Sequence, residues 1–467
     1  MAVTCAVEIV DSPLPRESLV EFSPGIGSQS LDAALKQATS SYTSRYPASK
    51  AHHENAVKHL PGGNTRSVLF NDPFPVVMKR GVHNRLWDDD GNEYLDLVGE
   101  LTAGLYGHNN PILQKAVIST YQDVGVNLGA TTMQEARFAE AICQRFPSVE
   151  QLRFCNSGTE ANIYALGLAK HITGKRKIVT FKGAYHGGVL SFVHGVGKNN
   201  VDPDDWIIAD YNDSEGLTKL MGETDNVAAV IVEAMQGAGG CIPATREFLE
   251  TVQWTAKKNN ALFILDEVMT SRLSPSGLQG KYSLDPDLTT MGKYLGGGMA
   301  IGVFGGKKHL LAAHDPRIKG SLPHSGTFNN NSLTMTCGFV GLTQIYTPSV
   351  AEGHNALGDY FRGRLEAIAQ GTSMVITGIG AVLTIHFLAN GKAPVREADL
   401  DTHSIPGLGR LFWFWCLENG FWITERGMIS IIVGTKRSEL DSFVECVEYF
   451  LKKYESLLVL GRDGSAQ

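Results

Sequence analysis

Short apolar runs alternate with helix-like stretches through the middle of the chain, between about residues 110 and 340. The apolar runs predict strands, and the stretches with a period near 3.6 residues predict amphipathic helices. The expected strands are 152–155, 177–181, 228–235, 261–267 and 301–306, and the expected helices are 133–145, 159–172, 245–259 and 331–346. This alternation is typical of an α/β fold with a mostly parallel sheet, which binds ligands in the loops at its strand ends.

The pattern differs on both sides of this region. Upstream, KRGVHNRLWDDDGNEYLDLV (79–98) alternates apolar and polar positions around DDDG, which predicts paired strands. Downstream, a smaller α+β domain is expected from a helix at 355–370, strands within 374–388 and 421–433, and a helix at 436–456. The chain is therefore expected to consist of an N-terminal extension (1–45), a segment 46–109, a large domain (110–345) and a C-terminal small domain (346–467).

Composition excludes several classes of partner. The 467 residues carry 41 Lys and Arg against 48 Asp and Glu, a net charge of −7, and the absence of a basic cluster argues against nucleic acid or an anionic membrane as a partner. No stretch reaches the roughly 18 apolar residues of a membrane span, and the N-terminus lacks the features of a secretory signal. The seven cysteines are scattered without a C-x-x-C pair, which predicts reduced thiols in a cytoplasmic protein and no zinc site.

Two charged residues stand out against apolar or glycine-rich surroundings. Asp266 closes the apolar run ALFILDE, so its carboxylate is expected at the tip of a buried strand. Lys293 lies in TTMGKYLGGGMAIGVFGG, where removal of water would lower the pKa of the amine and make it a nucleophile. Taken alone, each has an ordinary interpretation, a turn-capping Asp and a solvated Lys.

Two further motifs come directly after expected strands. In RFCNSGTEANIYALGLAK (153–170), a strand leads through Ser157, Gly158 and Thr159 into a helix, and the hydroxyls with the free helix N–H groups suit a phosphate. The spacing is not that of a P-loop, and a well-capped helix would look similar. In KGAYHGGVL (182–190), Tyr185 and His186 lie between glycines, where an aromatic ring could stack on a planar cofactor or simply pack in the loop.

Together, a phosphate-binding loop, a stacking aromatic, a strand-end carboxylate and a lysine match the requirements of pyridoxal 5'-phosphate. The carboxylate would keep the pyridine nitrogen protonated, and the lysine would hold the aldehyde as a Schiff base and then transfer protons. The combination is far more specific than any one of its parts.

From about residue 45 to 460 the sequence resembles the class III aminotransferases of the pyridoxal-phosphate fold type I superfamily, through NSGTEA, GAYHGG, DEVMTSR and GKYLGGGM. The resemblance implies a large domain with a mostly parallel sheet, a smaller α+β domain, and a homodimer with shared active sites. Segment 46–109 is expected to contribute to the small domain and to the dimer interface. The implied cofactor contacts are Lys293 (Schiff base), Asp266 (pyridine nitrogen), Ser157, Gly158 and Thr159 (phosphate), Tyr185 with His186, Met269 at the position after DEV, and Thr327 of HSGTFNNN on the neighbouring subunit's phosphate.

Within class III, the sequence is most similar to β-amino-acid (β-phenylalanine-type) aminotransferases and to glutamate-1-semialdehyde 2,1-aminomutase. PGGNTRSVLFNDPFP (61–75) implies that Arg66 holds a substrate carboxylate, and WITERGMISI (422–431) implies that Arg426 meets the carboxylate of a 2-oxo acid. A surface ion pair is the ordinary alternative for Arg426. The chain departs from the β-amino-acid pattern at three positions: Glu425 in place of Pro, Leu101 in place of Tyr, and Ala234 in place of Pro.

Three functions are compatible with these residues. The leading hypothesis is a ping-pong aminotransferase that moves an amino group from a β-amino acid or related amine donor to a keto-acid acceptor. Glu425, expected beside Arg426 as a further substrate-binding residue, favours the alternative, an intramolecular aminomutase acting on glutamate-1-semialdehyde. A cofactor-binding pseudo-enzyme is disfavoured because Lys293, Asp266 and the Ser157–Thr159 loop are all intact.

Overall fold

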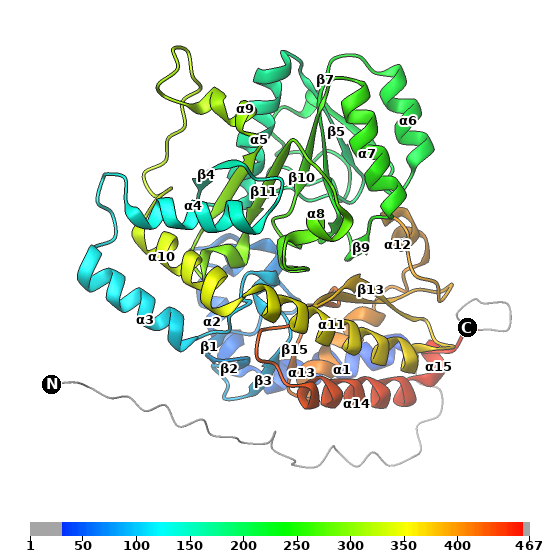
Figure 1. The fold of residues 1–467 in the computed structure, drawn as a ribbon. Coiled ribbons are helices and arrows are strands. Elements are labelled where there is room, and N and C mark those ends of the chain that lie inside the picture. Colours follow the sequence, from blue (N-terminus) through cyan, green and yellow to red (C-terminus); the bar gives the residue numbers. More distant parts are fainter. Residues whose placement is uncertain (1–29, 461–467) are drawn as a thin grey trace.

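A seven-stranded sheet forms the centre of the large domain, with its strands in the order β4-β12-β11-β10-β7-β5-β6 (Figure 1). In the computed structural model, which describes residues 30–460, these strands are Gln151–Cys155 (β4), Lys177–Phe181 (β5), Trp206–Ala209 (β6), Val227–Glu233 (β7), Leu262–Asp266 (β10), Leu288–Gly292 (β11) and Gly302–Gly306 (β12). Only β12 runs antiparallel to its neighbours, β11 and β4. The prediction of a mostly parallel α/β sheet is thus confirmed.

Helices cover both faces of this sheet. All seven residues of β7 are buried, as expected for a central parallel strand with no solvent-facing side. Val232 and Leu265 face the hydrophobic cluster that includes the helix α7 (Arg246–Lys258), whereas Ile231 and Ile264 face the cluster that includes the helix α5 (Gly158–Thr173). The other helices of this domain are Pro111–Ser119 (α3), Met133–Arg145 (α4), Ser214–Glu223 (α6), Gly277–Tyr282 (α8), Lys308–Leu311 (α9) and Ser332–Val340 (α10).

Two strands and several helices, among them α3 and α6, were not predicted from the sequence, and two predicted helices have other boundaries. The strands β6 and β11 were not predicted, because Trp206–Ala209 is short and Leu288–Gly292 contains two threonines and a glycine. The helix expected over 331–346 ends its α-helical part at Val340 and continues as a π-helical turn to Ile345. The next helix, α11 (Pro348–Ala369), begins earlier than residue 355, because Thr347 caps it and Pro348 occupies its first position.

The small domain combines both ends of the described chain. An antiparallel sheet contains Met374–Ile379 (β13), Val382–Phe387 (β14) and Met428–Ser430 (β16). A second sheet joins the predicted hairpin strands Met78–Val82 (β1), Arg85–Asp88 (β2) and Glu93–Asp96 (β3) to Phe421–Trp422 (β15), which pairs in parallel with β3. The helices are α11, Glu397–His403 (α12), Leu408–Glu418 (α13), Arg437–Lys453 (α14) and Glu455–Leu458 (α15).

The N-terminal helix α1 (Leu31–Arg45) packs against α13 in the lower part of Figure 1. Tyr42 is 2% exposed, and its hydroxyl donates to the Phe74 carbonyl at 2.6 Å. Residues 30–45, about the last third of the expected extension, therefore belong to the small-domain core, followed by α2 (Pro47–Ala56). The rest of that extension, residues 1–29, lies outside the described residues. Within residues 30–460, no helix has the length and apolar character needed to cross a membrane.

Candidate active site

Two buried carboxylates end adjacent parallel strands of the large sheet. Glu233 closes β7 and Asp266 closes β10, and the two residues are paired in register. Glu233 is 6% exposed and Asp266 is 3% exposed. Since ligands of α/β sheets bind beyond the carboxyl ends of the strands, this pair marks the candidate site.

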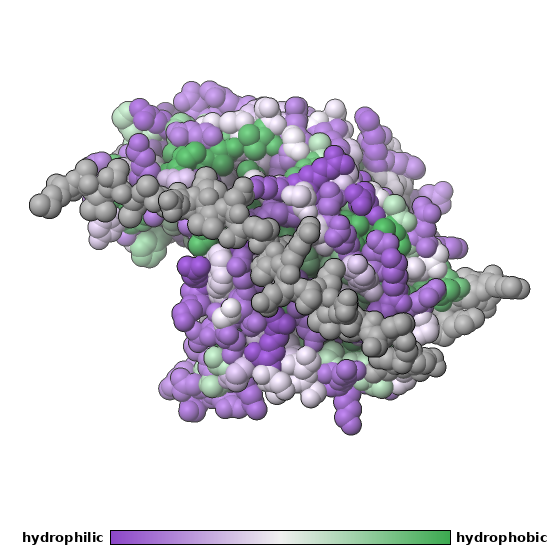
Figure 2. Space-filling model, turned by 90° about the horizontal axis from the view of Figure 1, so that it is seen from below, coloured by the Kyte–Doolittle hydropathy of each residue, from purple (hydrophilic) through white to green (hydrophobic). Residues whose placement is uncertain are grey.

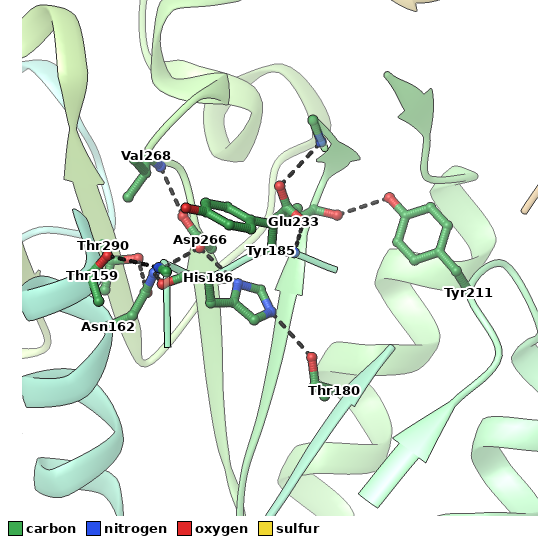
Figure 3. A network of polar contacts seen from close by, with 12 residues as sticks. Thr159, Asn162, Thr180, Tyr185, His186, Tyr211, Glu233, Asp266, Val268 and Thr290 are labelled. Carbon is green, nitrogen blue, oxygen red and sulfur yellow. Dashed lines mark hydrogen bonds and ion pairs between the residues drawn. The ribbon is translucent and has the colours of Figure 1, made fainter. Parts of the chain in front are cut away.

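Asp266 is held by three hydrogen bonds (Figure 3). Its Oδ2 contacts His186 Nδ1 at 2.7 Å and accepts from Asn162 Nδ2 at 2.8 Å, while its Oδ1 accepts from the Val268 backbone at 3.0 Å. The far ring nitrogen of His186 lies 3.2 Å from Thr180 Oγ1. His186 is thus buried behind Asp266 and fixes the orientation of the carboxylate.

Glu233 holds two backbone N–H groups at the same edge of the sheet. Its side chain accepts from the Tyr185 backbone N–H at 3.1 Å and from the Gly237 N–H at 3.2 Å. Burial raises the pKa of Glu233 to about 7, His186 lowers it, and the neighbouring Asp266 raises it further. The carboxyl therefore titrates near neutral pH in the folded protein.

Replacement of Glu233 by glutamine should change how stability depends on pH. Because the pKa of Glu233 is raised from 4.5 to about 7, the folded chain binds more protons than the unfolded chain in that interval, and this group lowers stability as pH rises through it. The Glu233→Gln protein should therefore gain stability relative to wild type between about pH 5 and 8. Thermal unfolding midpoints of the cofactor-free proteins check this, and a constant difference across the pH series would contradict the assignment.

Lys293 follows β11 directly and has a left-handed backbone with φ 55°. Such a conformation costs a non-glycine residue roughly 1–3 kcal/mol and is concentrated at functional sites. Burial lowers the pKa of the Lys293 amine, while Glu233 and Asp266 act in the opposite direction. The amine is consequently easier to deprotonate than an exposed lysine, as a nucleophile or a proton-transfer group requires.

The Ser157–Thr159 motif forms the start of α5. Ser157 Oγ accepts from the Glu160 N–H at 3.1 Å, and Thr159 Oγ1 accepts from the Gly188 N–H at 3.3 Å. Glycine is required at residue 158, since a Cβ there would lie 2.8 Å from Val268 Cγ1. The helix start thus packs against the loop that follows Asp266, with free N–H groups available for an anion.

Tyr185 and Met269 border the same region. Tyr185 is 43% exposed, and Figure 3 shows its ring between the side chains of Asp266 and Glu233. Met269 is 5% exposed, and its sulfur lies so close to Gly237 that a Cβ on that glycine would be 2.5 Å away. The region therefore combines an accessible aromatic ring with two buried carboxylates.

These residues fit pyridoxal phosphate. The donor set contains a helix N-terminus for the phosphate, an accessible aromatic ring, a buried carboxylate with fixed orientation and a partly buried lysine whose pKa is lowered. Each corresponds to one chemical part of the cofactor, and the four come together at one edge of the sheet.

The residues expected to bind substrate do not gather at one edge of the sheet as the cofactor residues do. Arg426 is exposed, but partial desolvation lowers the pKa of its guanidinium. The positive charge of Arg426 in turn lowers the pKa of the Lys293 amine. Glu425 instead accepts from Asn71 Nδ2 at 2.8 Å and lies 3.7 Å from Arg410 Nε. Arg66 forms an ion pair with Glu100. Thr327 is exposed on the loop before α10.

Sequence reasoning did not assign a role to Glu233 or to the support around Asp266. Glu233 carried the same signal as Asp266, since it also closes a buried apolar run. Asn162, whose Oδ1 accepts from Thr290 Oγ1 at 2.6 Å, is a helix residue with no distinguishing sequence signal. Thr290 lies in β11, the strand that was not predicted.

Comparison with known proteins agrees with this geometry. The chain is 47% identical over 428 residues to an uncharacterised aminotransferase of Schizosaccharomyces pombe, covering 92% of this chain and 97% of that protein. It is 43% identical over 432 residues to the beta-phenylalanine transaminase of Variovorax paradoxus (92% and 98% covered), and 32% identical over 426 residues to the glutamate-1-semialdehyde 2,1-aminomutase of Methanosphaera stadtmanae (87% and 98%).

Solved structures show the same relationship. The crystal structure of the beta-phenylalanine aminotransferase from Variovorax paradoxus matches with a TM-score of 0.90 at 42% identity, over 93% of this chain and all of that one. A transaminase with PLP bound matches with a TM-score of 0.78 at 29% identity, over 87% of this chain and 98% of that one. The model of the class-III aminotransferases matches residues 70–433. The chain therefore belongs to the class-III aminotransferases and is a pyridoxal-phosphate-dependent enzyme with the fold type I architecture.

Proposed function

We propose that this enzyme transfers an amino group from a β-amino acid or related amine to a 2-oxo acid by a ping-pong mechanism. The observation that carries the proposal is the partly buried Lys293, which directly follows β11 and whose amine interacts electrostatically with Asp266 and Glu233 at the neighbouring strand ends. The 43% identity to a beta-phenylalanine transaminase supports the donor class.

Each side chain has a distinct part in this proposal. Bound pyridoxal phosphate supplies an electron-withdrawing ring that makes the hydrogen next to the donor nitrogen acidic. Lys293 holds the cofactor and then moves that proton through its Nζ atom. Asp266, oriented by His186, places a negative charge at the ring nitrogen, and Tyr185 covers the ring. Ser157, Gly158, Thr159 and Met269 complete the cofactor pocket.

Carboxylate binding is assigned to two arginines. Arg66 binds the carboxylate of the β-amino acid, and Arg426 binds that of the 2-oxo acid, because a planar guanidinium can meet a carboxylate with two parallel hydrogen bonds. The electrostatic interaction of Arg426 with Lys293 supports its place near the reacting nitrogen.

A homodimer with shared sites is also part of the proposal. Thr327 is exposed on the loop 324–331, where it can reach the phosphate in a second copy. Figure 2 shows a mostly hydrophilic face with hydrophobic residues gathered in a few areas. Exposed apolar side chains that an interface could bury include Leu69, Phe70, Ile118, Tyr121, Leu128 and Phe328. A cytoplasmic location is proposed because all six cysteines of residues 30–460 are unpaired.

A half-reaction tests the proposed function. The holoenzyme is mixed with a β-amino acid in the absence of any keto acid, and the cofactor absorbance is followed. Conversion of the cofactor to its amino form with release of a keto product is expected. Turnover of glutamate-1-semialdehyde without a second substrate, and no change with β-amino acids, would instead identify the aminomutase, which the 32% identical relative makes the alternative.

Replacement of Arg66 by glutamine is expected to raise the KM for β-amino acids about tenfold or more, since a charge-assisted hydrogen bond contributes about 1.5–3 kcal/mol. The KM for an amine that lacks a carboxylate should change much less. Steady-state kinetics with both donors check this, and an unchanged KM for carboxylate donors would refute the role of Arg66.

A further inference from the structure

The guanidinium of Arg66 already has an anionic partner within the chain. Arg66 Nη1 forms a hydrogen-bonded ion pair with Glu100 Oε1. The two side chains keep 43% and 55% of their exposure, so the pair is open to solvent and to a competing anion. A substrate carboxylate that binds Arg66 must therefore compete with Glu100.

The backbone that carries Glu100 is held in an unusual conformation. Gly99, Glu100, Leu101 and Thr102 are consecutive residues with positive φ, of 50°, 49°, 51° and 79°. Only glycine adopts this left-handed region without cost, so the three residues after Gly99 store strain of the kind found at functional sites. A right-handed turn here would carry Glu100 away from its present position.

Buried contacts keep the turn in place. Asp96 Oδ1 accepts from the backbone N–H groups of Val98 and Gly99 at 2.8 and 3.0 Å, and its Oδ2 contacts His108 Nε2 at 2.8 Å. At the other end, Arg272 Nη1 donates to the Thr102 carbonyl at 3.2 Å. The turn is thus anchored on both sides.

Arg272 links this turn to the cofactor loop and to the small domain. It is fully buried, lies six residues beyond Asp266, and also donates to Ser430 Oγ at 2.9 Å and to the Ile431 carbonyl at 2.6 Å. Leu101 packs against the hydrophobic cluster that contains Met269. The turn that carries Glu100 is therefore anchored to the segment after Asp266 and to the small domain, which limits how far Glu100 can move when a substrate takes its partner.

We propose that Glu100 is a specificity-determining residue, an internal counter-ion that a donor's carboxylate must displace from Arg66. This inference rests on the proposed function. A donor with a carboxylate binds only after it breaks the Arg66–Glu100 ion pair. An amine without a carboxylate leaves the ion pair intact and contacts a pair with no net charge. Glu100 thereby lowers the ratio of kcat/KM for carboxylate donors to that for carboxylate-free amines. It also weakens the binding of small anions to Arg66.

The test compares two donors on the holoenzyme, a β-amino acid and an arylalkyl amine without a carboxylate. In the Glu100→Gln protein, the ratio of kcat/KM for the β-amino acid to that for the amine should rise about two- to fivefold, the range expected for an exposed ion pair. Competitive inhibition by acetate should strengthen by a similar factor. Glutamine keeps the size and backbone requirements of glutamate, so the turn is not further strained.

Two controls isolate the counter-ion. In an Arg66→Gln background, Glu100→Gln should leave the donor ratio unchanged, because there is no cation left to release. Glu250→Gln breaks a comparable exposed pair with Arg246 on α7 and should not move the ratio. A ratio that stays at the wild-type value in Glu100→Gln, or that rises equally in the Arg66→Gln background, overturns the inference.

The outcomes separate this inference from the proposed function. If Arg66→Gln raises the KM for the β-amino acid but Glu100→Gln has no effect on the donor ratio, the counter-ion role fails and the carboxylate role of Arg66 stands. If Arg66→Gln leaves that KM unchanged, the carboxylate role itself fails, and the counter-ion inference fails with it.

Discussion

The Lys293→Ala protein is expected to lose at least about four orders of magnitude in kcat, because the group proposed to hold the cofactor and move the proton is removed. Borohydride reduction of the wild-type holoenzyme, followed by peptide mass spectrometry, should place the pyridoxyl group on Lys293. In the variant the cofactor should bind without a covalent link. The lowered pKa of the Lys293 amine, caused chiefly by burial, is what suits it to both tasks.

A matched replacement controls for the loss of a lysine as such. Lys281 is exposed on α8, and Lys281→Ala should retain wild-type turnover and labelling. Partial recovery of Lys293→Ala by added small primary amines would further identify proton transfer as the missing step. Sustained multiple turnover by Lys293→Ala without such amines would remove Lys293 from the mechanism.

The second large effect is expected for Asp266→Asn, which should lower kcat by about two to three orders of magnitude. Asparagine fills the same space but lacks the negative charge proposed to keep the ring nitrogen protonated. It also brings an N–H₂ group into a site where His186 Nδ1 and Asn162 Nδ2 both approach Oδ2, at 2.7 and 2.8 Å. Single-turnover kinetics of the donor half-reaction measure the loss.

The opposite end of the same strand provides the control. Asp287 accepts from the Phe263 N–H at 2.8 Å, near the start of β10, so Asp287→Asn should alter stability with little effect on kcat. The Asp266→Asn protein should remain folded, with a lower unfolding midpoint than wild type, because its amide N–H₂ group meets donors from which the carboxylate accepts. A wild-type kcat in a folded Asp266→Asn protein would refute the proposed role.

Much of this site could be predicted because its chemistry coincides with local patterns. Asp266 is the last residue of a strand that is almost entirely buried. Ser157 caps α5, as the S-G-T-E sequence indicates. The alternation of apolar runs predicted the strands β4, β5, β7, β10 and β12, because parallel strands covered on both faces have few polar positions. It missed β6, β11, α3 and α6.

What could not be predicted depends on contacts between distant segments. The ion pair of Arg66 with Glu100 joins residues 34 positions apart, and the raised pKa of Glu233 depends on which strand lies beside β7. The helix α13 is apolar nearly all round, and so it carried no amphipathic signal. The expectation that Glu425 contacts substrate could not foresee its bond to Asn71, 354 residues away in the chain.

The pairing of β15 with β3 has a consequence for biosynthesis. Phe421 and Trp422 lie beside Leu95 and Asp96, so this sheet lacks an outer strand until Phe421 and Trp422 have left the ribosome. Closing a loop of this length is entropically costly, and contacts of such long sequence separation form slowly. The large domain can fold around its own strands before β15 is available. During that time the free edge of β3 is exposed and can pair with strands other than β15.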